Sequence, residues 1–218
     1  MVKKKVFIVD DHPVVRQGLT AFINGEDDLV VCGDAEEAND AIKKINQLRP
    51  NIIIADISLK GTGGLELTTA IKARFNIPVL VLSMHDESIY AERAIRAGAR
   101  GYVMKKESMD IVVRAIHEIL SGKMYMSEEL KQRLLGKLLT NPTETQQSPL
   151  DSLTNREMEV FHLIGSGLSN RHIAKKLSLS VKTVETYRFR IITKLNLSNS
   201  SELVQYAIQW SHDGTKGA

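Results

Sequence analysis

The first 125 residues alternate between short apolar runs and longer amphipathic segments, and this alternation constrains the fold most strongly. The apolar runs contain many β-branched residues, as strands do, and read KVFIVD, LVVCGDA, NIIIADI, PVLVLS and GYVM. Helical spacing of apolar residues follows each run, over 14–23, 36–48, 65–75, 88–97 and 108–120. Five strand–helix repeats joined by short turns predict a doubly wound α/β domain with a five-stranded parallel sheet.

The remainder of the chain follows a helical pattern that one polar segment interrupts. Apolar spacing predicts a further helix over 127–139. The next segment, TNPTETQQSPLDS, has the Thr-, Pro-, Gln- and Ser-rich composition of a linker. We therefore predict a first domain over 1–125, a linker helix and flexible linker over 126–149, and a second domain over 150–218.

The second domain is predicted to be a small all-α domain of four helices. Its first helix starts with a capping box, in which Glu157 follows Thr154 by three residues. The other helices are expected over 169–177, 181–195 and 199–210. A short helix, a tight turn and a longer basic helix form a helix-turn-helix, whose second helix enters the major groove of DNA.

The charge distribution is compatible with nucleic-acid binding by this domain. The chain has 29 Lys and Arg against 26 Asp and Glu, and the excess lies in the last third. Between residues 171 and 194, Glu185 is the one acidic residue in a basic stretch, although such a helix face is more often simply solvated. The longest apolar stretch, IPVLVL, is too short to cross a membrane. A single cysteine and a start without a signal-peptide pattern predict a cytoplasmic protein.

Acidic residues gather where the predicted strands end. Asp10 and Asp11 follow the first strand, and Asp56 follows the third. If these two strands are neighbours in a parallel sheet, the three carboxylates share one crevice, where a Mg²⁺ ion would offset their repulsion. Alternatively, Asp10 and Asp11 merely form the polar turn before a helix that begins at Pro13.

Two further side chains at strand ends suit phosphoryl transfer. Ser83 ends the fourth strand, and its hydroxyl can donate a hydrogen bond to a phosphoryl oxygen. Lys105 follows the fifth strand and would supply an ammonium group. A carboxylate nucleophile, a metal, a hydroxyl and an ammonium together favour formation of an aspartyl phosphate.

These motifs resemble those of a known family. Four motifs resemble, in their order and spacing, the receiver domain of two-component response regulators. They are VDDHP, IIIADIS, VLS and GYVMKK. The stretch that begins LTNREMEVFHLI closely resembles the LuxR-type helix-turn-helix. The combination is similar to the NarL/FixJ class of bacterial transcription regulators, which implies a flavodoxin-like receiver.

The resemblance implies a role for each matching residue. Asp56 would accept a phosphoryl group from a sensor histidine kinase, and Lys105 would hold one of its oxygens. Ser83 and Tyr102 would be a switch pair, in which Ser83 moves toward the phosphoryl oxygen and Tyr102 turns inward. The Mg²⁺ ligands would be Asp10, Asp11, Asp56 and the backbone carbonyl of Ser58.

The predicted recognition helix has two faces. One carries a helical stripe that should face the domain core, namely Val184, Tyr187, Ile191 and Leu195. On the other face, the residues predicted to face the groove are Glu185, Thr186 and Phe189, and those nearer the phosphates are Lys182, Thr183, Arg190 and Lys194. One small helix-turn-helix buries limited DNA surface, so we expect a homodimer on two half-sites of double-stranded DNA. The resemblance implies that the unphosphorylated receiver covers this helix and that phosphorylation releases it.

Two other interpretations compete with a phosphorylation-switched regulator. An enzyme that turns over an aspartyl phosphate is disfavoured, because DIS lacks the second Asp of haloacid-dehalogenase-like phosphatases and no glycine-rich nucleotide loop is present. We therefore predict no enzyme activity beyond self-phosphorylation and slow autodephosphorylation. A receiver that only mediates dimerisation remains open, although the intact set of predicted site residues argues against it.

Overall fold

The computed structural model describes residues 2–59, 63–84, 87–139, 149–177 and 179–215. The chain divides into two compact units, Met1–Leu139 and Thr140–Ala218. Most of the predicted flexible linker falls on residues 140–148, which lie outside the described residues. The domain boundaries given above therefore stay a prediction.

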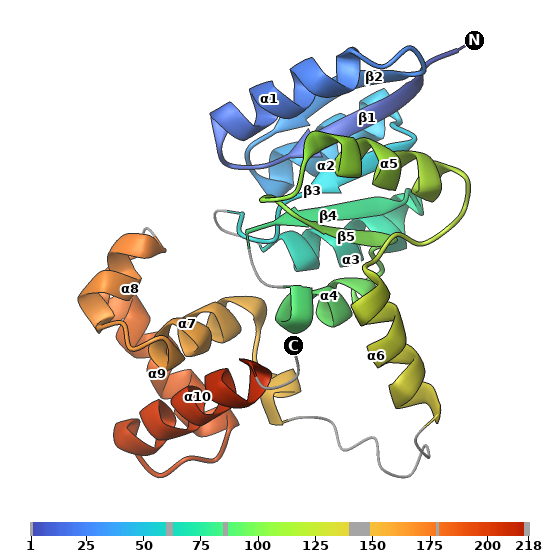
Figure 1. Cartoon of the computed structure of the whole chain (residues 1–218). Coiled ribbons are helices and arrows are strands. Elements are labelled where there is room, and N and C mark those ends of the chain that lie inside the picture. Colours follow the sequence, from blue (N-terminus) through green and yellow to red (C-terminus); the bar gives the residue numbers. More distant parts are fainter. Residues whose placement is uncertain (1, 60–62, 85–86, 140–148, 178, 216–218) are drawn as a thin grey trace. The chain divides into compact units, whose positions relative to one another are not determined.

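The first unit is a five-stranded parallel sheet between two layers of helices (Figure 1). The strands are β1 (Lys4–Val9), β2 (Leu29–Ala35), β3 (Ile52–Ala55), β4 (Val79–Ser83) and β5 (Gly101–Met104). Their spatial order is β2–β1–β3–β4–β5, with every neighbouring pair parallel. The predicted doubly wound α/β fold is confirmed, and β1 lies beside β3 as the carboxylate site requires.

Helices cover both faces of this sheet, because strand side chains alternate between two buried layers. One face is covered by α1 (Pro13–Asn24) and α5 (Met109–Leu120), and the other by α2 (Ala38–Leu48), α3 (Gly64–Phe75) and α4 (Glu87–Arg96). Under α1 and α5, Leu19 and Ile116 pack in one cluster with strand residues such as Ile8. The sheet is therefore buried on both faces, and only its ends are open for chemistry.

A further helix, α6 (Glu128–Leu139), follows α5 and contacts α4. Leu130 is buried, and Ser127 N donates a hydrogen bond to the Glu87 side chain at the start of α4 (3.3 Å). The backbone of Tyr125 bonds to both Arg100 and Tyr102 along the edge of β5. The segment after α5 therefore belongs to the first unit and covers the edge of its sheet.

The described part of the second unit is helical, as predicted. Its elements are a 3₁₀ turn η2 (Pro149–Ser152), α7 (Asn155–Gly165), α8 (Asn170–Lys176), α9 (Val181–Lys194) and α10 (Ser200–Thr215). The capping box of Thr154 and Glu157 begins α7, and the side chain of Ser180 caps α9. Phe161 of α7 packs against Tyr206 and Trp210 of α10. α9 contacts α7, α8 and α10, so the helix-turn-helix of α8 and α9 is packed against the other two helices.

Candidate functional site

Backbone hydrogen bonds place the predicted acidic and basic residues at one end of the sheet. Asp10 N donates to Ala35 O (3.1 Å), and Asp56 N donates to Val9 O (2.9 Å). On the other side, Lys105 N donates to Ser83 O (2.7 Å). Each bond continues the strand ladder one residue beyond the strand, so the sheet itself fixes the backbone that carries these side chains.

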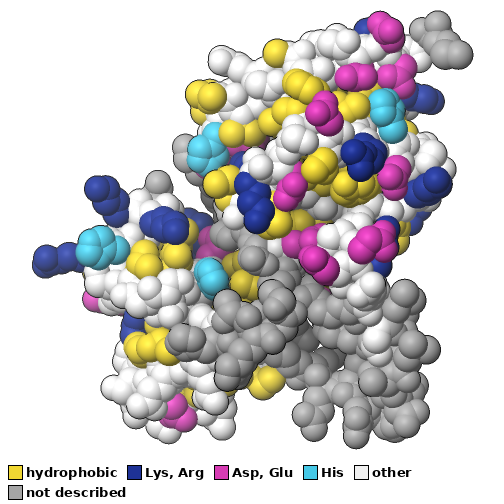
Figure 2. Space-filling view, in the orientation of Figure 1, with side chains coloured by type: hydrophobic (Ala, Val, Ile, Leu, Met, Phe, Trp, Pro, Cys, Tyr) yellow, Lys and Arg dark blue, Asp and Glu magenta, His cyan; other side chains and the backbone are white. Residues whose placement is uncertain are grey.

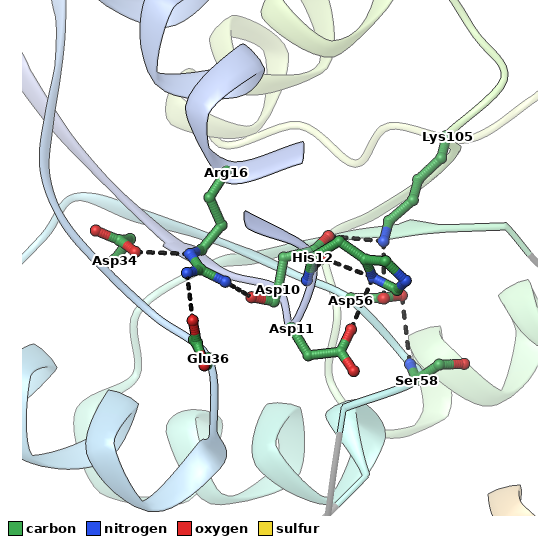
Figure 3. A network of polar contacts seen from close by, with 9 residues as sticks. All are labelled: Asp10, Asp11, His12, Arg16, Asp34, Glu36, Asp56, Ser58 and Lys105. Atoms are coloured by element: carbon green, nitrogen blue, oxygen red, sulfur yellow. Dashed lines mark hydrogen bonds and ion pairs between the residues drawn. The ribbon is translucent and has the colours of Figure 1, made fainter. Parts of the chain in front are cut away.

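The ammonium group of Lys105 lies between two buried carboxylates (Figure 3). Its Nζ is 2.6 Å from Asp10 Oδ2 and 2.7 Å from Asp56 Oδ2. The side chains of Asp10 and Asp56 are each 3% exposed, and that of Lys105 is 7% exposed. One cation therefore serves two carboxylates that water hardly reaches.

The pKa values of this cluster follow from burial and from the unequal number of charges. Burial raises the pKa of Asp56, Asp10 adds to the effect, and the opposing influence of Lys105 does not cancel it. For Lys105, burial alone would lower the pKa, but Asp56 and Asp10 outweigh burial and raise it. The raised pKa of Lys105 keeps its ammonium group charged, and the raised pKa of Asp56 indicates that Lys105 only partly compensates the charge of this carboxylate.

Asp11 adds a third carboxylate to the cluster. Its Oδ1 is buried and lies 2.7 Å from His12 Nδ1, but the geometry is not that of a hydrogen bond, and within the described part of the chain this oxygen accepts none. Asp10, Asp11, His12 and Asp56 each offer one ligand atom, and these atoms lie within 4.8 Å of one another. Three carboxylates that converge in this way fit Mg²⁺, which prefers oxygen ligands.

The remaining predicted receiver residues lie around this cluster. Ser58 N donates a hydrogen bond to Asp56 Oδ1 (3.3 Å), so the loop after Asp56 turns back onto its carboxylate. Tyr102 pairs with Val81 in the register of β4 and β5, which places its side chain on the same face of the sheet as Ser83. Both Ser83 and Tyr102 are buried. Their role as a switch pair stays a prediction, as does the Ser58 carbonyl ligand.

Gly64, at the start of α3, holds the loop that carries Asp56. Its N–H donates to Ile57 O (2.8 Å), and a Cβ at this position would lie 1.7 Å from Asp56 O. Any side chain here would push the backbone of the loop away from the helix. The close approach of α3 therefore fixes the position of Asp56.

Sequence reasoning missed Arg16, which anchors the loop after β1 (Figure 3). Its Nη1 donates to Asp10 O (2.6 Å), while Nε and Nη2 bond to Asp34 (2.8 Å) and Glu36 (2.6 Å). The side chain is only 12% exposed. Its acceptors beyond β1 lie 18 and 20 residues away along the chain, so no local motif marks this contact.

The second unit presents a basic surface on α8 and a mixed one on α9. Figure 2 shows Lys and Arg side chains over α8, where Arg171, Lys175 and Lys176 are exposed. On α9, Val184 and Ile191 are buried as predicted. Six of the seven predicted DNA-contacting residues are exposed, namely Lys182, Glu185, Thr186, Phe189, Arg190 and Lys194, and Thr183 is half-buried.

Two of the predicted DNA contacts, Thr183 and Lys194, have partners inside the unit. Lys194 Nζ lies 2.7 Å from Oε2 of the buried Glu157, and the hydroxyl of Thr183 bonds to that of Ser180 at the start of α9 (2.7 Å). Burial acts to raise the pKa of Glu157, but the bonds from Lys194 and Thr154 prevail and lower it. The sequence marked Glu157 as a helix cap and gave no sign of this ion pair.

Comparisons with known proteins agree with both halves of this description. A family model for the response regulator receiver domain matches residues 6–117, and one for bacterial regulatory proteins of the luxR family matches residues 151–207. The oxygen regulatory protein NreC of Staphylococcus epidermidis is 34% identical over 94% of this chain and 97% of its own length. This chain belongs to the NarL/FixJ-class response regulators.

Other relatives of this response regulator match it over nearly their full length. Response regulator GacA of Pseudomonas aeruginosa is 34% identical over 94% of this chain and 95% of its own. A structure of RcsB from Salmonella enterica serovar Typhimurium, bound to promoter rprA in the presence of phosphomimetic BeF3−, has a TM-score of 0.59 and 26% identity. That match covers 94% of this chain and 98% of RcsB. In the part of the response regulator that the structure describes, no helix is long and apolar enough to cross a membrane.

Proposed function

We propose that this response regulator accepts a phosphoryl group on Asp56 from a sensor histidine kinase and then binds DNA as a dimer to regulate transcription. The observation that carries the proposal is the buried cluster in which Lys105 is shared by Asp56 and Asp10. A structural ion pair needs one cation and one anion. Here the excess of carboxylate oxygens suits a site that takes up a cation and then a phosphoryl group.

In the proposed transfer, an Asp56 carboxylate oxygen attacks phosphorus and forms a new P–O bond. The bond between phosphorus and the kinase histidine nitrogen breaks, and its electron pair stays on the imidazole. Lys105 holds a phosphoryl oxygen, and the hydroxyl of Ser83 donates to another while Tyr102 turns inward. These residues position the group and compensate its charge, without a proton transfer from the protein.

Mg²⁺ is the cofactor of this proposal, with Asp10, Asp11, Asp56 and the Ser58 carbonyl as its protein ligands. When bound, the metal compensates the negative charge of the phosphoryl oxygens. Oδ1 of Asp11 supports this assignment, because it is buried and the neighbouring His12 Nδ1 gives it no hydrogen bond. The family is one of transcription regulators, so self-phosphorylation and slow autodephosphorylation are the only reactions we propose.

DNA binding is assigned to the exposed face of α9, with phosphate contacts from Lys182 and Arg190. Thr183 and Lys194 stay predicted phosphate contacts, although each also has a partner within the unit. RcsB supports the DNA and phosphorylation parts of the proposal, since its structure contains promoter DNA and a phosphate mimic. Because the protein is proposed to act on DNA, we propose that it works in the bacterial cytoplasm.

Intact mass spectrometry after incubation with Mg²⁺ and acetyl phosphate tests the acceptor assignment. We expect one phosphoryl group on the wild type and on Asp40→Asn, whose carboxylate lies on the surface of α2. We expect none on Asp56→Asn. If the wild type stays unmodified with both acetyl phosphate and a histidine kinase as donor, the receiver is a phosphate-independent dimerisation module instead.

A further inference from the structure

Phe189 is the largest exposed apolar side chain in the described part of the second unit, with 70% of its surface accessible. It lies near the middle of α9, five residues after Val184 and two before Ile191, which are both fully buried. At 3.6 residues per turn, these separations place Phe189 on the opposite side of the helix from the core. Packing within the unit therefore does not account for an aromatic ring at this position.

Two threonines flank Phe189 on the exposed face of α9. Thr186 precedes it by three residues and Thr193 follows it by four, so all three side chains are neighbours on one face. Thr186 Oγ1 donates to Lys182 O, and Thr193 Oγ1 donates to Phe189 O, both at 3.0 Å. Each hydroxyl has one hydrogen and uses it inside the helix, so neither threonine donates to a ligand in this arrangement.

These three residues form an apolar strip (Thr186, Phe189 and Thr193) with little capacity to donate hydrogen bonds. Exposed cations, Lys182 and Arg190, accompany it on the same helix. This combination fits a ligand with a negatively charged backbone and an apolar group on the surface that faces the helix. In the major groove of DNA, the apolar group on a base edge is the 5-methyl group of thymine.

We propose that Phe189, supported by Thr186 and Thr193, reads the 5-methyl group of a thymine in each half-site. The inference rests on the proposed DNA-binding function and names the base feature that gives it specificity. A phenyl ring offers no hydrogen bond to any base edge, so contact with a methyl group is the discrimination that it can make.

Deoxyuridine provides the sharpest test, because it differs from thymidine only by the missing methyl group. Full-length protein, phosphorylated with acetyl phosphate and Mg²⁺, first selects its sites from a random duplex library. Each thymine of the enriched site is then replaced singly by deoxyuridine, and affinity is measured at one salt concentration. We expect one thymine per half-site at which the replacement weakens binding about fourfold, the factor that burial of one methyl-sized group supplies.

Variants of α9 connect this loss to Phe189. In Phe189→Ala, thymine and deoxyuridine sites should bind equally well, whereas Phe189→Leu should retain most of the discrimination. Arg190→Ala should weaken both sites alike and leave their ratio unchanged. Phe189 and Arg190 are exposed, so these variants should fold, and the fluorescence of Trp210 in the helical core checks this.

The possible failures are distinguishable. The proposal is wrong if no thymine position discriminates, or if the discrimination persists in Phe189→Ala, although DNA binding itself would then stand. An equal preference for 5-methylcytosine over cytosine at the same position would show that the methyl group, rather than the thymine base, is read, which supports the proposal. Failure of the phosphorylated protein to enrich any sequence contradicts the proposed function and this inference with it.

Discussion

Each unit of the chain pairs a lysine with a buried carboxylate, and the two clusters differ in how their charges balance. In the second unit, Lys194 pairs with Glu157, whose carboxylate also accepts a hydrogen bond from the backbone of Thr154. In the first unit, Lys105 is shared by Asp10 and Asp56. The pKa of Glu157 is lowered by its partners, whereas that of Asp56 is raised by burial.

We interpret this difference in charge balance as the difference between a structural ion pair and the proposed phosphorylation site. Lys194 and Glu157 join the end of α9 to the start of α7, and one cation matches one anion. Around Lys105 the carboxylates outnumber the cation, which is unfavourable unless a bound cation offsets the excess charge. Burial alone therefore does not indicate a functional site, whereas an unbalanced buried charge favours one.

Among the variants considered, Glu157→Gln should change the free energy of unfolding most. Thr154 N and Lys194 Nζ both donate to Oε2 of Glu157. A glutamine oxygen can accept both bonds but carries no charge, so we expect a loss of about 2 kcal/mol in the free energy of unfolding. Urea unfolding followed by Trp210 fluorescence measures it. The control is Glu202→Gln, because Glu202 accepts from Ser198 N before α10 in a similar way (2.6 Å) and should lose under about 0.5 kcal/mol. Equal losses of stability in Glu157→Gln and Glu202→Gln would contradict a stabilising role for the ion pair.

The same ion pair predicts how the stability of the second unit depends on pH. The pKa of Glu157 is lower in the folded state than its ordinary value, so its contribution is present above the unfolded pKa and disappears as the pH falls through the folded pKa. The difference between wild type and Glu157→Gln should therefore be constant near neutral pH and vanish in acid. A difference that grows on acidification would contradict this sign.

Asp56→Asn should raise the free energy of unfolding, whereas Glu157→Gln should lower it. Removing one of two carboxylates that share Lys105 relieves an unbalanced charge, so in EDTA we expect the first unit to gain about 1 kcal/mol. Calorimetry of the full chain measures this gain, with Trp210 fluorescence identifying the transition of the second unit. Asp40→Asn, which removes only an exposed ion pair with Lys44, should change stability by less than about 0.5 kcal/mol. A marked loss in Asp56→Asn would mean that both clusters are merely structural.

Arg16→Lys should have the smallest effect, which we expect on metal affinity. It tests how the loop that carries Asp10 is held in place. Lysine keeps the charge but cannot donate to Asp10 O, Asp34 and Glu36 together as the guanidinium does. We expect the Mn²⁺ concentration for half-saturation, followed by electron paramagnetic resonance, to rise about threefold. Arg96→Lys, on the surface of α4, is the matched control and should leave metal binding unchanged. An unchanged Arg16→Lys protein would mean that the loop needs no anchor.

The sequence was sufficient for the features that depend on periodicity and on strand ends. The order of strands and helices followed from apolar spacing, and the convergence of Asp10 with Asp56 followed from the parallel pairing of β1 and β3. Contacts between distant positions were out of reach. The ion pair of Lys194 with Glu157 was missed, because Glu157 lies 37 residues earlier and approaches α9 only in the folded unit. Arg16 was missed for the same reason.

The most direct test of the account is the DNA affinity of the full-length protein with and without acetyl phosphate and Mg²⁺, at one salt concentration. For the wild type we predict at least a tenfold gain on phosphorylation, because the phosphoryl group on Asp56 biases the protein toward its DNA-binding state. Asp56→Asn should show no gain, and Asp40→Asn should behave as the wild type does. Equal affinities for phosphorylated and unphosphorylated wild type would contradict the proposal that phosphorylation of Asp56 switches DNA binding.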